Sequence, residues 1–111
     1  MSSKSQILLD FGGTHTKSQT WIDGVLISQE ICRSPQSSRG LRGEVTIDPR
    51  EFSEHAIQMF NIAKESATSN CELAVSSQMA CFLLLGVDGR PASEIVSWQD
   101  ERSLYLSLIH I

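Results

Sequence analysis

Hydrophobic residues in the first part of the chain form short runs separated by turn residues, a pattern that predicts β-strands. Residues 6–11 form an apolar run that ends at a glycine pair, which we interpret as a buried strand followed by a turn. Strand-like runs at 16–22 and 25–32 flank an Asp-Gly pair, which is typical of tight hairpins. The chain is therefore expected to open with an antiparallel meander.

The middle of the chain changes to helical spacing. Residues 34–43 are rich in serine and glycine and predict a loop, and residues 45–47 predict a short strand. Asp48 as N-cap and Pro49 at the first helical position predict a helix that runs to about residue 68. The apolar residues expected on its buried face are Phe52, Ala56, Met59, Phe60 and Ala63.

The last part of the chain returns to strand-like runs. Residues 72–76 predict a strand after the helix, and residues 81–85 and 95–98 predict a hairpin around a turn at 87–90. The order of elements is therefore several strands, one helix and then further strands, which indicates an α/β fold.

Length, charge and cysteine content exclude several classes of protein. The 111 residues are enough for one small domain, and a net charge of −4 offers no basic patch for nucleic acid. The three cysteines contain no Cys-x-x-Cys pair, which disfavours a disulfide framework or a zinc site. No apolar run approaches the ~20 residues of a membrane span, so the expected location is the cytoplasm.

Residues 10–17 combine side chains that suit a nucleotide phosphate. Glycines let backbone N–H groups approach an anion, and hydroxyl and ammonium groups add donors; the residues concerned are Gly12, Gly13, Thr14, Thr16 and Lys17. Asp10 would repel phosphate directly, but it suits a hydrated Mg²⁺ that bridges to phosphates. The alternative is a plain hairpin whose turn needs glycine. The spacing is neither a P-loop nor a dinucleotide-binding fingerprint.

Four motifs in order resemble one protein family. Asp-x-Gly-Gly-Thr-x-Thr-Lys at 10–17 resembles the first phosphate motif of the actin-like ATPase superfamily. Three later blocks, Ser-Gln-Met at 77–79, the turn at 83–91 and Trp-x-Asp-x-Arg at 98–102, are similar to those of FGGY-type carbohydrate kinases. The resemblance implies part of a ribonuclease H-like, actin-like ATPase domain, with an incomplete mixed sheet that begins as an antiparallel meander.

The resemblance also implies an activity and a set of site residues. The activity is transfer of the γ-phosphoryl group of ATP to a sugar or polyol hydroxyl, with Mg²⁺ as the second cofactor. Asp10 would position Mg²⁺ and the transferred phosphate. The residues implied to face the substrate are Gln78, Met79, Trp98, Asp100 and Arg102. Many xylulose kinases have histidine after the methionine, whereas this chain has Ala80, which argues against D-xylulose as the substrate.

The same resemblance sets the expected domain organisation. Residues 1–106 would be part of the first kinase domain, with the general base beyond the chain, so the chain alone is expected to be inactive. Residues 107–111 look anomalous, either as translated sequencing-adaptor read-through or as a truncated terminal helix. Two other functions use the same fold: a ROK-like or BadF-like nucleotide-binding sensor and a non-catalytic actin-like module. The Gly-Gly form of the turn also occurs in the ROK group.

Overall fold

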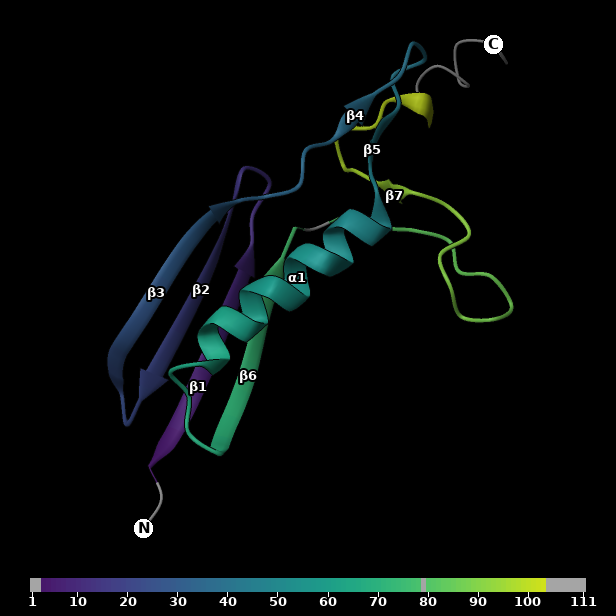
Figure 1. Ribbon diagram of the computed structural model, residues 1–111. Helices are drawn as coiled ribbons and strands as arrows, with labels where there is room; N and C mark the ends of the chain where they lie inside the picture. Colours follow the sequence, from purple (N-terminus) through teal and green to yellow (C-terminus); the bar gives the residue numbers. More distant parts are fainter. Residues whose placement is uncertain (1–2, 79, 104–111) are drawn as a thin grey trace. The chain divides into compact units, whose positions relative to one another are not determined.

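The computed structural model describes residues 3–78 and 80–103 (Figure 1). The elements follow the order β1 (Lys4–Phe11), β2 (His15–Ile22), β3 (Val25–Arg33), β4 (Ser38–Arg39), β5 (Val45–Ile47), α1 (Pro49–Lys64), β6 (Asn70–Ser77) and β7 (Ile95–Val96). Within the described ranges, residues 3–34 and 53–78 form one compact unit and residues 35–52 and 80–103 form a second.

The first unit contains a four-stranded mixed sheet in the order β3-β2-β1-β6. β1 pairs with β2 and β2 pairs with β3 in antiparallel fashion, while β6 pairs with β1 in parallel (Figure 1). A register shift between Thr20 and Trp21 interrupts the β2–β3 ladder near its hairpin. The predicted α/β class, the antiparallel meander and the mixed sheet are confirmed.

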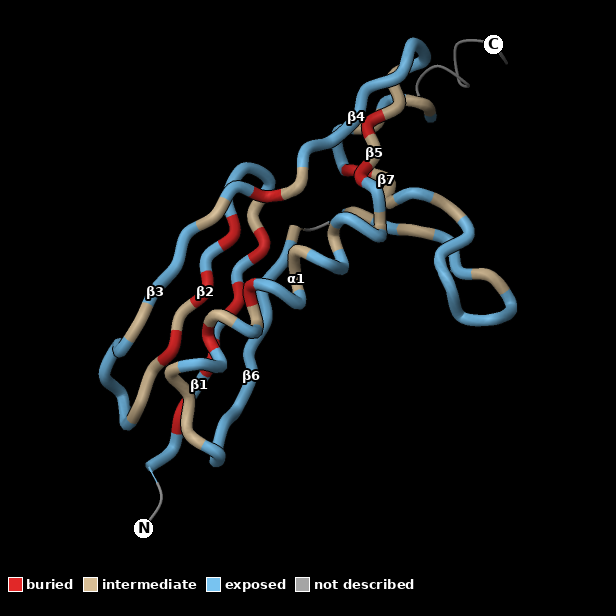
Figure 2. Tube along the Cα trace, in the orientation of Figure 1, coloured by how far each residue is buried: buried red, intermediate tan, exposed pale blue. Residues whose placement is uncertain are grey.

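Alternate residues of β1 and β2 are buried, as Figure 2 shows by the red segments along both strands. β1 contributes Ile7, Leu9 and Phe11, and α1 contributes Met59 and Ala63. Because successive side chains of a strand point to opposite faces, the other residues of β1, including Asp10, lie on the opposite face. β6 is exposed throughout its length.

β2 contributes hydroxyl groups to the core instead of apolar side chains. Thr16, Ser18 and Thr20 are all buried. Ser18 Oγ donates to the Met59 carbonyl at 3.0 Å, and Thr20 Oγ1 donates to the Ala63 carbonyl at 2.7 Å. Each buried hydroxyl therefore has a hydrogen-bond partner, which removes most of the cost of taking it out of water.

The start of α1 agrees with its sequence signals, but its end does not. Asp48 Oδ1 accepts the Arg50 N–H at 3.0 Å, which confirms the predicted N-cap. The helix ends at Lys64 and not near residue 68, because Ala67 N–H bonds to the Lys64 carbonyl at 3.1 Å in a tighter turn.

No helix within the described ranges is long and apolar enough to span a membrane.

The second unit contains a three-stranded antiparallel sheet in the order β4-β5-β7. β5 occupies the predicted residues, and Val45 and Ile47 are buried. The predicted strands at 81–85 and 95–98 are only partly present: β7 has two residues, and Phe82 forms a single bridge to Val96. Leu85 forms a second isolated bridge, to Pro91, and Ser93 Oγ accepts the Leu84 N–H at 2.9 Å in place of a backbone carbonyl.

Candidate functional site

The candidate site begins where β1 and β2 approach the turn at residues 12–14. Asp10 on β1 has Lys17 on β2 as its Cα partner on one side and Ser76 on β6 as its partner on the other. All three residues are exposed. The register therefore brings a carboxylate, an ammonium group and a hydroxyl together on the sheet face opposite α1.

Gly12 closes the turn and its position requires glycine. Its N–H donates to the His15 carbonyl at 3.0 Å. A Cβ built on Gly12 would lie 2.6 Å from that same carbonyl oxygen, which is too close for any side chain. A Cβ on Gly13 would meet the Gln78 side chain at 3.6 Å, an ordinary contact. The two glycines of the motif therefore differ: only Gly12 is required by the protein's own packing.

Ser34, which follows β3, forms two hydrogen bonds to the turn from the side of the buried face. Ser34 Oγ donates to the Gly12 carbonyl at 2.7 Å, and the Ser34 N–H donates to the Thr14 carbonyl at 2.9 Å. Thr16 Oγ1 lies 2.9 Å from Ser34 Oγ and 2.7 Å from His55 Nε2 of α1. From the sequence, Ser34 was predicted only as part of a loop, and His55 was not predicted to take part in the site.

The predicted phosphate-binding residues fall into two groups. Gly13, Thr14 and Lys17 are exposed, as a residue that contacts a ligand must be. Thr16 is fully buried, with a relative exposure of 0%, and its hydroxyl is engaged by Ser34 and His55. Its side chain is therefore directed into the protein and not toward the outer surface of the turn.

Of the residues predicted to face the substrate, Gln78 belongs to the first unit and lies beside Gly13. Met79 lies outside the described residues. Trp98, Asp100 and Arg102 belong to the second unit. Trp98 is 59% exposed, so it is not a core residue.

Asp100 and Arg102 form a paired group. Arg102 Nε donates to both Asp100 oxygens, at 3.0 and 3.2 Å, and Arg102 Nη2 lies 3.0 Å from Oδ2. Asp100 also accepts the N–H groups of Val45 at 2.9 Å and Arg102 at 3.0 Å. The Arg102 side chain, assisted by these two N–H groups and opposed by burial, lowers the pKa of Asp100 to about 2. Asp100 therefore joins β5 to the segment that carries Arg102.

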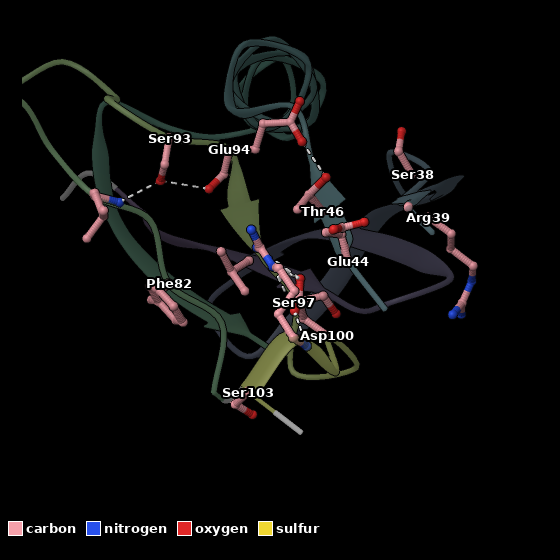
Figure 3. A pocket seen from close by; sticks show the side chains of 14 residues that line it. Ser38, Arg39, Glu44, Thr46, Phe82, Ser93, Glu94, Ser97, Asp100 and Ser103 are labelled. Carbon is pink, nitrogen blue, oxygen red and sulfur yellow. Dashed lines mark hydrogen bonds and ion pairs between the residues drawn. The ribbon is translucent and has the colours of Figure 1, made fainter. Parts of the chain in front are cut away.

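Asp100 and Arg102 also line a cavity of about 730 Å³ in the second unit (Figure 3). Phe82 and Leu84 give part of the wall an apolar character, and Glu94 bonds to Thr46 of β5. The Arg102 guanidinium has five N–H donors, and its side chain is 42% exposed. The wall therefore combines apolar surface with polar groups, as sites for small polar ligands do.

The residues of the turn suit a hydrated Mg²⁺ and not a closed metal centre. Within residues 3–78 and 80–103, no group of three or more His, Cys, Asp and Glu side chains comes together. Mg²⁺ commonly keeps several waters and binds through one or two carboxylates and substrate phosphates. The single exposed carboxylate of Asp10 beside the glycine turn fits that mode of binding.

The fold is shared with carbohydrate kinases of known structure. Gluconate kinase from Lactobacillus acidophilus superposes with a TM-score of 0.79 at 21% identity over 98% of this chain. Ligand-bound xylulose kinase from the same organism gives 0.76 at 22% identity over 96% of the chain. Glycerol kinase from Plasmodium falciparum, solved with ADP, gives 0.70 at 16% identity over 96%.

These comparisons establish the fold of the chain. The chain spans 22–23% of the length of these three kinases. No family model and no curated protein sequence matches the chain. The structural likeness confirms the predicted resemblance to carbohydrate kinases at the level of the fold.

Proposed function

We propose that this chain is the N-terminal segment of an ATP-dependent carbohydrate kinase, which phosphorylates a hydroxyl of a sugar or polyol in the cytoplasm. The turn at Gly12 carries the proposal. Its closure leaves no space for a Cβ, and it lies between the exposed Asp10 and Lys17. The shared fold with gluconate, xylulose and glycerol kinases supports the same conclusion.

The proposed roles in phosphate binding follow from position and charge. When bound, ATP would supply the phosphoryl group, and Mg²⁺ would neutralise part of the charge on its phosphates. Asp10 is proposed to hold the hydrated Mg²⁺, and Lys17 adds a positive charge one strand away. Gly13 and Thr14 present backbone and hydroxyl donors on the exposed side of the turn. Positioning and charge neutralisation account for most of the catalysis in phosphoryl transfer.

The resemblance to carbohydrate kinases also suggests which residues would face the substrate. Gln78 would donate or accept hydrogen bonds through its amide, and Trp98 would offer an exposed aromatic face. Met79, which follows Gln78 in the sequence, is also proposed to face the substrate. Asp100 is proposed to act by holding Arg102, because five contacts from Val45 and Arg102 already occupy its two oxygens. The general base is proposed to lie outside this chain, so the isolated chain would not transfer phosphate.

An assay of the complete protein that carries this segment tests the proposal. ADP release is measured with a panel of sugars and polyols for the wild type, Asp10→Asn and Asp23→Asn. Asp10→Asn is expected to lower kcat at least roughly 100-fold, the low end for losing a group that stabilises developing charge. Its unfolding midpoint should stay unchanged, because Asp10 is exposed.

Asp23→Asn makes the same chemical change at the β2–β3 hairpin, away from the turn at Gly12. It should leave kcat at the wild-type level. Normal turnover in Asp10→Asn, or an equal loss in both variants, would contradict the role of Asp10.

A further inference from the structure

We propose that His55, Thr16 and Ser34 are positioning residues that set the orientation of the phosphate-binding turn through a directed chain of hydrogen bonds. The inference rests on the proposed function, because it assigns these side chains to the turn that would hold the nucleotide phosphates. Thr16 would then act on the phosphates indirectly, through Ser34 and the Gly12 peptide.

Counting protons shows which group donates in each hydrogen bond of this series. Three contacts of 2.7 to 2.9 Å join His55 Nε2, Thr16 Oγ1, Ser34 Oγ and the Gly12 carbonyl in series. A carbonyl only accepts, so the single Ser34 proton goes to Gly12. Thr16 must then donate to Ser34, and the third proton must come from His55. The geometry therefore requires His55 to carry a proton on Nε2.

The packing around His55 supports a fixed orientation of its ring. The ring lies edge-on to Phe11, with centroids 6.3 Å apart and an interplanar angle of 68°. Phe11 is buried and directly precedes Gly12. The helix that carries His55 therefore reaches the turn both through the aromatic contact and through the hydrogen-bond chain.

The hydrogen-bond chain sets the direction of one backbone donor, the Gly13 N–H. Ser34 holds the carbonyls of both Gly12 and Thr14. In a trans peptide the N–H points away from the preceding carbonyl, and the described residues contain no cis peptide bond. Fixing the Gly12 carbonyl toward Ser34 therefore aims the Gly13 N–H away from Ser34. A preoriented N–H of this kind binds an anion without further reorganisation.

The other buried hydroxyls of β2 provide a matched comparison. Thr16 and Thr20 are both fully buried and both lose a hydroxyl on substitution by valine. Thr20 donates to the Ala63 carbonyl of α1 and not to the turn. Thr20→Val should therefore reproduce the loss of a buried hydrogen bond without disturbing Gly12 or Gly13.

The first test uses NMR of the 111-residue chain and needs no activity. In the wild type, the ring nitrogen resonances of His55 should show a proton on Nε2. Thr16→Val should raise amide exchange of Gly12 and Ser34, whose N–H groups donate to the His15 and Thr14 carbonyls, about fivefold, the change expected for one lost hydrogen bond. Thr20→Val should leave these two amides unchanged, and Thr16→Ser, which keeps the hydroxyl, should restore them.

The second test uses the complete kinase and the same three variants. Thr16→Val should raise KM for ATP about fivefold or more while KM for the sugar stays the same, and Thr20→Val should change neither. An unprotonated Nε2 on His55 in the wild type would contradict the proposed hydrogen-bond chain. Equal effects of the two valine variants on the turn amides would also contradict it. Intact NMR signatures with no ATP-dependent sugar phosphorylation would instead refute the proposed function alone.

Discussion

The two adjacent glycines of the turn should respond very differently to the same substitution. In Gly12→Ala the new methyl group would lie 2.6 Å from the His15 carbonyl oxygen that the Gly12 N–H now bonds. The turn must open to accept it. In Gly13→Ala the methyl group would meet only the Gln78 side chain, at 3.6 Å, so the backbone has no reason to move.

The expected size of the effect follows from these contacts. Losing the Gly12–His15 hydrogen bond costs about 1 kcal/mol, and the residual backbone strain adds roughly 1–3 kcal/mol. Gly12→Ala should therefore lower the free energy of unfolding by about 2–4 kcal/mol. For a chain of this size that corresponds to a fall in Tm of roughly 10–20 °C. Gly13→Ala should stay within about 0.5 kcal/mol of the wild type.

Urea unfolding followed by circular dichroism measures both variants under the same conditions. The m-value of each variant must match that of the wild type, so that the midpoints report stability. A Gly12→Ala variant as stable as the wild type would refute the geometry of the turn. So would equal losses in the two variants, because only one of the two positions lacks space for a methyl group.

Three further predictions concern other parts of the chain. The pKa of Asp100 is about 2 in the folded state against an ordinary 3.8, so ionised Asp100 stabilises the folded chain fully above about pH 4, and this contribution is lost as pH falls toward 2. Asp100→Asn should flatten the pH dependence of the urea midpoint in that window. An unchanged slope would argue against the pairing with Arg102. Leu73 and Val75 on β6 are 52% and 58% exposed, so replacing both with threonine should reduce binding of a hydrophobic dye to the chain, and a large fall in the unfolding midpoint would show that they are buried instead. Because Ala80 has no side-chain donor for a sugar hydroxyl, the proposed kinase activity of the complete protein should not prefer D-xylulose. A kcat/KM for D-xylulose tenfold above that for all other sugars, a difference of ~1.4 kcal/mol, would contradict this.

Much of the fold was predictable because local signals and tertiary structure agree. The capping residues Asp48 and Pro49 and the strand at 45–47 are found where the sequence places them. The end of α1 was not predictable, because the Thr68 N–H bonds to Ser5 Oγ at 3.0 Å, 63 positions away in the sequence. Contacts of this range leave no local pattern.

The candidate site was predictable only in its exposed part. The order Asp-x-Gly-Gly marks Asp10 and the turn, but it does not separate Gly12, which has no space for a Cβ, from Gly13, which has. Extending the β2–β3 register past Cys32 would place Ser34 beside the turn only if the register were known. The register shift between Thr20 and Trp21 moves the pairing by one residue, and nothing in the sequence shows this shift. His55 gave no signal at all.

Phosphorus NMR of the complete protein tests the central claim most directly. The protein is incubated with Mg·ATP and a mixture of sugars and polyols, and the fate of the γ-phosphate is followed. The proposed function predicts that the γ-phosphate signal is replaced in equal amount by a sugar or polyol phosphomonoester, with ADP as the other product. Release of inorganic phosphate alone, or bound nucleotide with no turnover, would contradict a carbohydrate kinase and favour a nucleotide-binding sensor or an actin-like module.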